Sequence, residues 1–212
     1  ILLMSATPIP RTLARTVYGD LDTSNIPDPP AGRPPIKTRI EPWSRHDIVE
    51  QFIIEEVAKG RQAFIVCPLI DESEAVLARA ATAEYERLRE TSFAGLRVGL
   101  LHGRMPLGDK QIVMDEFRHG DLEVLVATPV IEVGIDVPIA TVMVIQGANR
   151  FGLAQLHQLR GRVGRGSHQS SCYLITESAS NDAISRLKEL GKTNDGFQIA
   201  EADLRLRGPG DY

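Results

Sequence analysis

The sequence has no excess of positive charge and few aromatic residues. Its 212 residues include 24 Lys and Arg against 28 Asp and Glu, which gives a formal net charge of −4, and aromatic residues make up 5%. A module that holds nucleic acid on a continuous basic or aromatic surface usually shows the opposite composition. Any contact with nucleic acid is therefore expected to come from local groups, and a purely non-enzymatic binding module is disfavoured.

Long apolar runs and clusters of metal-binding residues are also missing. No run approaches the ~18 apolar residues that a membrane helix needs, and no signal peptide is visible. Cys67 and Cys172 each lie within an apolar run, which favours buried thiols in a cytoplasmic protein over a disulfide. The five histidines show no metal-ligand spacing, so no metal site is predicted in this chain. The sequence begins with Ile1, within an apolar run and without an initiator Met, and we therefore expect it to be a fragment.

A phosphate loop is a further absence, and it limits the chemistry most. Residues 191–193, Gly-Lys-Thr, match the end of such a loop, but Arg186 stands where its first glycine would be. A charged helix rather than a buried strand precedes them. The acidic pairs at 71–72 and 115–116 are explained by the first turn of a helix and by a solvated helix face. No complete nucleotide site is predicted, which argues against a self-contained kinase or ATPase.

What the chain does contain is a regular alternation of apolar strands and helices. Strands are expected at 36–43, 62–70, 97–101, 122–127, 141–146 and 171–176, with helices at 45–59, 73–90 and 106–119. Strands that are apolar throughout and alternate with helices predict an α/β fold, a parallel sheet covered on both faces. Functional loops are then expected to leave the carboxyl ends of the strands.

Changes of composition suggest where the chain divides. Five prolines and a glycine within residues 26–35 predict an extended, semi-rigid linker after a first segment, 1–25. After the alternating region, 36–178, two helices at 181–191 and 197–206 predict a helical hairpin with a following loop within 179–212. No internal repeat is visible.

Residues 158–165, Gln-Leu-Arg-Gly-Arg-Val-Gly-Arg, combine paired arginines with two glycines. At ~100° per residue, a helix through this stretch would have one apolar and one polar face. The apolar face would carry Leu156, Leu159 and Val163, and the polar face Gln158, Arg162 and Arg165. The two guanidinium groups would then project together from a rigid base.

The glycines of this stretch decide how the arginines are interpreted. Gly161 and Gly164 each cost ~1 kcal/mol relative to Ala inside a helix. That cost is reasonable where a large anion or another backbone must approach closely. The alternative is an ordinary arginine-rich helix face in contact with solvent.

The loop at 128–138 places a hydroxyl, two carboxylates and a glycine after a buried strand. Thr128 is suited to bond a backbone phosphate, because hydroxyls commonly position nucleic acid in this way. Gly134 permits a close approach, and Asp136 is suited to accept a hydrogen bond from a sugar hydroxyl. Taken alone, the stretch fits an ordinary strand-to-helix loop equally well.

Taken in order, several stretches resemble the motifs of superfamily 2 helicases and translocases. Residues 5–7, Ser-Ala-Thr, resemble motif III, residues 128–138 motif V, and residues 158–165 motif VI. Residues 102–105, His-Gly-Arg-Met, resemble the strand-end motif that meets the nucleic-acid backbone in this group. Further stretches, at 6–13, 66–70, 100–105 and 207–210, are most similar to the branch-migration DNA helicases of the superfamily. The transcription-repair coupling factors come next, and Pro209 favours the former.

The resemblance implies a role for each matching residue. Arg162 and Arg165, with Gln158 in the same motif, are expected as catalytic residues, the two arginines reaching the γ-phosphate of ATP. Gly134 and Asp136 are expected to face the nucleotide. DNA contacts are expected from Thr128, His102, Arg104, Arg205 and Arg207. Ser5 and Thr7 are expected in a turn that couples the nucleotide state to DNA grip.

The resemblance also implies an architecture and a function. The chain is expected to hold the end of a first motor lobe at 1–25, the linker at 26–35, a second RecA-like lobe at 36–178 and a translocation hairpin at 179–212. ATP and Mg would be bound mainly by the first motor lobe, whose phosphate loop and acidic motif would precede Ile1. The chain alone is therefore not expected to hydrolyse ATP.

The expected parent protein is an ATP-dependent DNA helicase that reverses forks and migrates branches in repair and recombination. Its expected partners are forked or branched double-stranded DNA and the N-terminal motor lobe and wedge domain of the same protein. It is expected to be a monomer in the bacterial cytoplasm, associated with the nucleoid. One alternative is a DNA translocase like the coupling factors. The other is an RNA helicase lobe, because motifs V and VI do not show whether the sugar of the bound nucleic acid is that of DNA or RNA.

Overall fold

A computed structural model describes residues 33–68, 73–129, 137–177, 180–193 and 195–207, apart from the side chains of 204, 206 and 207. The described residues form one six-stranded sheet in the order β1-β6-β5-β2-β4-β3, and every neighbouring pair is parallel. The strands are β1 (Lys37–Pro42), β2 (Gln62–Val66), β3 (Val98–Leu101), β4 (Val124–Ala127), β5 (Ala140–Ile145) and β6 (Ser171–Thr176). The predicted α/β fold with a parallel sheet is confirmed.

Burial along the strands explains why the chain makes this sheet. Every residue of β2, β4, β5 and β6 is buried, as expected for strands covered on both faces. The edge strand β1 instead alternates between exposed and partly buried residues, and it carries Lys37 and Arg39 on its exposed positions. Charged side chains on an edge strand discourage pairing with another chain.

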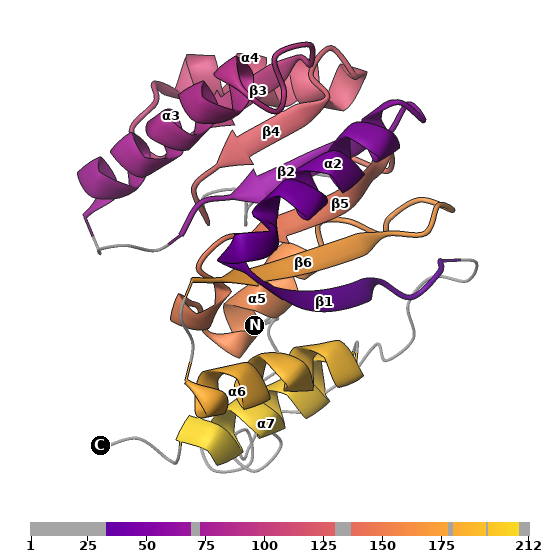
Figure 1. The fold of residues 1–212 in the computed structure, drawn as a ribbon, viewed down its shortest axis with the longest axis vertical. Coiled ribbons are helices and arrows are strands. Elements are labelled where there is room, and N and C mark those ends of the chain that lie inside the picture. Colours follow the sequence, from indigo (N-terminus) through magenta and orange to yellow (C-terminus); the bar gives the residue numbers. More distant parts are fainter. Residues whose placement is uncertain (1–32, 69–72, 130–136, 178–179, 194, 208–212) are drawn as a thin grey trace, which may run out of the picture.

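Helices cover both faces of the sheet (Figure 1). On one face, α2 (His46–Val57) and α3 (Glu74–Glu90) close an apolar core that includes Ile53, Leu88 and Phe93. On the other face, α4 (Leu107–His119) and α5 (Leu153–Arg160) close a second core that includes Phe117 and Leu156. The short 3-10 helices η1 (Trp43–Arg45) and η3 (Ala148–Arg150) lead into α2 and α5.

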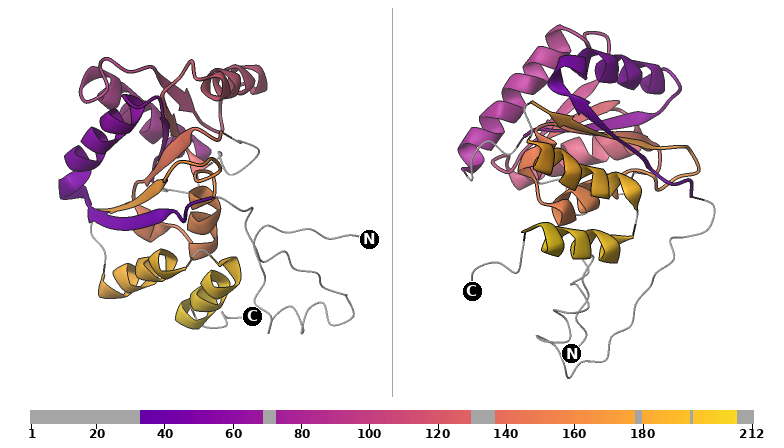
Figure 2. Two further views of the ribbon diagram at one scale, coloured as in Figure 1. Left: turned by 90° about the vertical axis from the view of Figure 1, so that its right-hand side faces the viewer. Right: turned by 60° about the horizontal axis from the view of Figure 1, so that its bottom comes forward.

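The hairpin of α6 (Asn181–Lys192) and α7 (Gly196–Arg207) packs beside β1 and α5, as the two views of Figure 2 also show. Leu187 and Leu190 of α6 and Ile199 of α7 belong to the same core as α5. Ser180 caps α6, because its hydroxyl accepts a hydrogen bond from the Ala183 amide at 3.2 Å. The hairpin is thus joined to the sheet through a shared core.

The helix predicted through the arginine stretch is wrong. Helix α5 ends at Arg160, Gly161 is its C-cap, and Gly164 has φ +77°. A left-handed residue four positions past the last residue of the helix is compatible with glycine but not with a continuing helix. The two glycines therefore end the helix instead of interrupting it, and Arg162 and Arg165 lie on the loop that follows.

Most other predicted elements are confirmed in type, with ends shifted by a few residues. The strand expected at 62–70 ends at Val66 among the described residues, and α6 continues through Gly191 to Lys192. The expected boundaries of the linker and of the first segment fall largely on residues 1–32, which are outside the description. The helices in the described part of the chain are all too short or too polar to span a membrane.

Candidate functional site

Thr128, His102 and Arg104 lie together at the carboxyl ends of β4 and β3. The Thr128 amide donates to the Leu101 carbonyl at 3.0 Å, so the residue that follows β4 is hydrogen-bonded to the last residue of β3. Thr128 is buried, His102 is partly exposed and Arg104 is exposed. The structure thus gathers three of the five residues for which DNA contacts were predicted at this edge of the sheet.

The loop after β3 is held in one conformation by its own contacts. The Met105 amide donates to the His102 carbonyl at 3.2 Å, and the His102 amide donates to the Met105 sulfur at 3.4 Å. Lys110, in the first turns of α4, donates its ammonium group to the Gly103 carbonyl. The loop is therefore ordered before any ligand arrives, and it presents Arg104 to solvent.

Two positively charged side chains, Lys110 and Arg104, act on the His102 ring. Burial lowers the pKa of His102, and the charges of Lys110 and Arg104 lower it further. Its Nδ1 atom is buried and has no hydrogen-bond partner within the described part of the chain. The ring is thus a neutral group in a field that favours an anion.

The arginine loop lies at the opposite, amino-terminal end of the sheet. A Cβ on Gly164 would stand 2.8 Å from Cγ1 of Ile36, which directly precedes β1. A Cβ on Gly166 would overlap the carbonyl of Pro138, which lies just before β5. The expectation that functional loops leave the carboxyl ends is therefore wrong for Arg162 and Arg165, because α5 carries the chain back to the start of the strands.

The same packing brings two predicted motifs together. Pro138 is the last residue of the 128–138 stretch, and Gly166 directly follows the last residue of the 158–165 stretch. The Arg165 Nε donates to the Gly161 carbonyl at 3.1 Å, which places this guanidinium over the end of α5. Arg162 and Gln158 are both partly exposed. The arginine loop thus meets the end of the other segment that was expected near nucleotide.

Arg160 is the functional-site neighbour that the sequence argument missed. It is 2% exposed, and its guanidinium donates to the carbonyls of Leu190 and Thr193, the latter at 3.0 Å. It also donates to the Thr38 hydroxyl at 3.3 Å. Arg160 therefore ties the end of α5 to β1 and to the end of α6, where carbonyls lack partners within the helix.

A signal for Arg160 was present in the sequence. Arg160 lies four residues after Leu156 and seven after Leu153, which puts it on the apolar face of α5. An arginine on an apolar face must find hydrogen-bond acceptors in the interior, and here the acceptors are backbone carbonyls.

His157 completes the contact between α5 and the hairpin. The Arg160 Nη2 donates to His157 Nδ1 at 3.1 Å, so this nitrogen is an acceptor and the ring is neutral. Burial lowers the pKa of His157 to about 4, and the charge of Arg160 adds to the effect. The hydrogen bond is lost when His157 is protonated.

The remaining predicted site residues are placed only in part. Arg205 is exposed on α7. Ser5, Thr7, Gly134 and Asp136 lie outside the described residues, as does the side chain of Arg207. Their predicted roles in coupling, nucleotide contact and DNA contact stay predictions.

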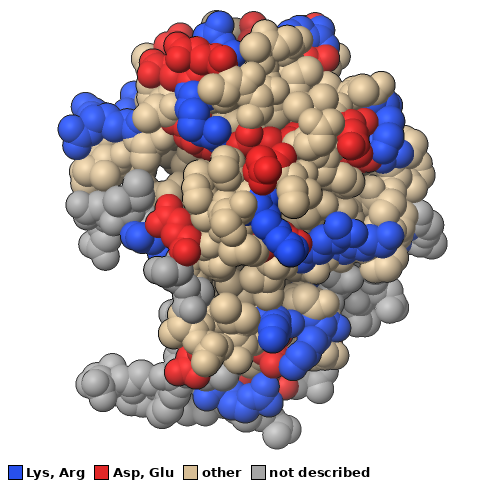
Figure 3. Space-filling model, viewed as in Figure 1, with Lys and Arg blue, Asp and Glu red and all other residues tan. Residues whose placement is uncertain are grey.

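Charge on the described surface is mixed rather than segregated. On the face shown in Figure 3, Lys and Arg side chains lie among Asp and Glu side chains. Several charged side chains of the described residues form ion pairs, among them Lys59 and Arg61 with Glu56, and Arg87 with Glu50 and Glu84. Among the described residues, no group of three or more His, Cys, Asp or Glu is arranged to hold a metal ion. Binding of a polyanion would depend on small local sites.

Comparison with known proteins gives the class to which this arrangement belongs. Residues 44–167 match the family described as "Helicase conserved C-terminal domain". The chain belongs to this family, and its parallel sheet with helices on both faces is the RecA-like fold of a helicase C-terminal lobe. The predicted membership of a helicase superfamily is confirmed.

Within this family, the chain is similar to ATP-dependent DNA helicase RecG. It is 53% identical to the RecG of Synechocystis sp. over 100% of the chain and 26% of that protein. It is 52% identical to the RecG of Escherichia coli K12 over 99% of the chain and 30% of that protein. A solved structure of RecG bound to a three-way DNA junction matches 98% of the chain and 27% of its own, with 49% identity and a TM-score of 0.83.

The hairpin carries a further similarity to the same helicase. Residues 193–212 match the family described as "ATP-dependent DNA helicase RecG, domain 3, C-terminal". The whole chain spans between a quarter and a third of the length of the relatives that it matches.

Proposed function

We propose that this chain is the second motor lobe and translocation hairpin of an ATP-dependent helicase that acts on branched DNA. The relatives that it matches over its whole length are ATP-dependent DNA helicases, and one of them is solved on a three-way DNA junction. The observation that carries the proposal is the close packing of the arginine loop against Pro138. This packing brings together the segments 128–138 and 158–165, both of which were predicted to face the nucleotide. It lies at the amino-terminal end of the sheet, opposite to the residues that were predicted to contact DNA.

In this proposal Arg162 and Arg165 complete an ATP site whose phosphate-binding groups and Mg ligands belong to another lobe. A guanidinium fits this role because it stays charged and can bond two phosphate oxygens at once. Gln158, one turn before Arg162, supports the same site. The chain itself supplies no phosphate loop, so nucleotide hydrolysis requires both lobes.

At the other end of the sheet, Thr128, His102 and Arg104 contact the DNA backbone. Opening and closing of the cleft between lobes would move these residues along the strand. The buried Arg160 would transmit that motion to the hairpin, because it fixes α5, which leads into the arginine loop, to the end of α6. In a bacterial cytoplasm the expected substrate is forked DNA, which the wedge domain of the same protein would help to recognise.

The test is ATP hydrolysis by the protein that joins this chain to its phosphate-loop lobe. Arg165→Ala and Arg162→Ala should each lower DNA-stimulated kcat by roughly 10³–10⁵-fold, the range known for arginine fingers. Arg89→Ala, on the exposed surface of α3, serves as the matched control and should leave kcat unchanged. The 212-residue chain alone should show no Mg-dependent ATPase activity.

Two outcomes would overturn the proposal. One is an ATPase activity of the isolated chain that survives Arg165→Ala. The other is unwinding of duplex RNA in preference to forked DNA when the two compete for the two-lobe protein, which would point to an RNA helicase.

A further inference from the structure

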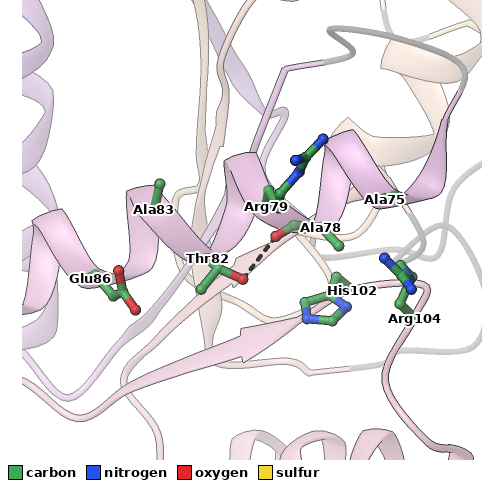
Figure 4. Close-up of a pocket in the computed structure, with 8 residues that line it drawn as sticks. All are labelled: Ala75, Ala78, Arg79, Thr82, Ala83, Glu86, His102 and Arg104. Atoms are coloured by element: carbon green, nitrogen blue, oxygen red, sulfur yellow. Dashed lines mark hydrogen bonds between the residues drawn. The ribbon is translucent and has the colours of Figure 1, made fainter.

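A pocket of about 450 Å³ lies between α3 and the loop that follows β3 (Figure 4). Its lining comes from Ala75, Ala78, Arg79, Thr82, Ala83, Glu86, His102 and Arg104. Since α3 begins after β2 and the loop begins after β3, the pocket opens at the carboxyl end of the sheet, where Thr128 also lies. Neither α3 nor any of its residues was predicted to contact DNA.

Small side chains on α3 create the hollow. The helix presents Ala75, Ala78 and Ala83 where longer side chains would fill the space against the loop. The helix itself is fixed on the sheet. Glu84 accepts from the amide of Gln146 at 2.7 Å, and Arg87 donates to Glu50 at 2.6 Å. The pocket is therefore bounded by a rigid helix on one side and by the ordered loop on the other.

Positive groups gather at the end of the pocket nearest the strand ends. Arg79 and Arg104 are exposed, and neither makes a hydrogen bond or ion pair with another described residue. Lys110 adds a third charge behind the loop through its bond to Gly103. The carboxylates nearby are Glu74, which lies against Gly103, and Glu86 on the next turns of α3. Neither of them is paired with Arg79 or Arg104 among the described ion pairs.

We propose that this pocket seats one backbone phosphate of a DNA strand, with Arg79 contacting the phosphate directly alongside Arg104. The inference rests on the proposed function and adds a residue and a subsite to it. Arg79 of α3 and Arg104 of the loop both line the pocket, and two guanidiniums suit a phosphodiester, which offers two anionic oxygens. Phosphate contacts position a strand without reading its sequence, and the alanine side chains of the wall offer no hydrogen-bonding group to a base.

His102 supplies an independent reason to place an anion here. Its Nδ1 is buried and has no hydrogen-bond partner among the described residues, and burial together with the charges of Lys110 and Arg104 lowers its pKa. A phosphate in the pocket would neutralise part of that field, so the pKa of His102 should rise when DNA binds. A strand that bound elsewhere on the chain would leave the His102 titration unchanged.

The first test is the affinity of the 212-residue chain for a fluorescein-labelled single strand, measured by anisotropy at several salt concentrations. Arg79→Gln should weaken binding about fivefold at 0.1 M salt and lower the slope of log K against log salt by ~0.7, the contribution of one phosphate contact. Ala75→Leu should weaken binding by a similar factor without changing net charge, because it fills the pocket.

The matched control is Arg89→Gln, which removes the same charge from the other end of α3. Arg89 stacks on Tyr85 and lies outside the pocket. It should change affinity by less than twofold, and circular dichroism should show that all three variants remain folded. Equal losses for Arg79→Gln and Arg89→Gln would reduce the effect to overall charge and overturn the proposal.

The second test is the His102 titration followed by NMR with and without the strand. The pKa of His102 should rise on binding to the unaltered chain and rise less in Arg79→Gln. If the unaltered chain binds, Arg104→Gln weakens binding and Arg79→Gln does not, the pocket is wrong while the proposed function stands. If the unaltered chain shows no binding and no shift at His102, both fall together.

Discussion

The two ends of the sheet are built in opposite ways. At the carboxyl end, Arg79 and Arg104 are exposed around a pocket and make no bonds with other described residues. At the amino end, the arginine loop is packed so closely that Gly164 and Gly166 have no room for a Cβ, and Arg160 is buried beside it. One end offers open positive charge, and the other is fixed in place by close packing.

The difference matches the two tasks that a motor lobe must perform. A strand that slides along the protein needs contacts that form and break quickly, which exposed side chains on a rigid base provide. A group that completes an active site must be held within a fraction of an ångström, which requires packing and hydrogen bonds around it. Three predictions test how far the contrast holds, from the largest expected effect to the smallest.

Arg160→Met would break the amino end most severely. It removes the donor to the buried carbonyl of Leu190 and to the partly buried carbonyl of Thr193, and should lower the free energy of unfolding by about 3–5 kcal/mol. Amide hydrogen exchange should show α6 and α7 losing protection first. The exposed Arg104→Met should cost less than about 0.5 kcal/mol in urea unfolding. Equal costs for the two variants would abolish the contrast between the two ends.

A pair of glycines allows the same comparison without removing any charge. Gly166→Ala places a methyl group on the Pro138 carbonyl and should cost about 2–3 kcal/mol, because backbone on both sides must shift. At the carboxyl end, Gly108 of α4 has open space at its Cβ position, and Gly108→Ala should stabilise by about 0.5–1 kcal/mol through helix propensity. Thermal unfolding of both variants measures the difference, and a neutral Gly166→Ala would show that the arginine loop is not tightly packed.

Acid should loosen the amino end before it affects the rest of the described fold. The pKa of His157 falls from 6.5 to about 4 on folding, so the unfolded chain takes up the proton first and stability declines as the pH drops from 6.5 towards 4. Because the ring is partly exposed, we expect a loss of about 1–2 kcal/mol between pH 7 and pH 5, centred on hairpin docking.

The control for this pH effect is His157→Gln, which should remove most of the decline in that range. The carboxylates with lowered pKa values, Glu56 and Glu84, lose their contribution only below the ordinary carboxyl pKa of 4.5 and so act at lower pH. Hydrogen exchange of α6 against pH is the measurement. A decline of the same size in His157→Gln would assign the effect to another group.

The sequence predicted the sheet well because strand identity is local information. Runs such as 122–127 are apolar throughout, and a run buried on both faces fits only the interior of a covered sheet. The pair His102 and Thr128 was also predicted correctly as a group at the strand ends, since both follow such runs directly. Family membership was predicted from short motifs, which can be recognised in the sequence without knowledge of the fold.

The arginine stretch was harder because its helical periodicity and its glycines point to different structures. Periodicity alone favoured a continuous helix, whereas Gly161 and Gly164 end it. Which of the two effects wins depends on the residues that surround Gly164, namely Ile36, which precedes β1, and Ser170, which precedes β6. Ile36 lies more than a hundred residues before Gly164 in the sequence, and Ser170 reaches it only because the chain turns between them. No local pattern reports that contact.

By itself, the sequence determined that these 212 residues form a parallel α/β helicase lobe with paired arginines and contain no phosphate loop. The tertiary structure decided that those arginines lie on a packed loop at the amino end, that Arg160 is buried against the hairpin, and that Arg79 joins His102 at a pocket. The reason is that composition and periodicity act within a few turns of chain, whereas burial and the meeting of charges depend on segments brought together by the sheet.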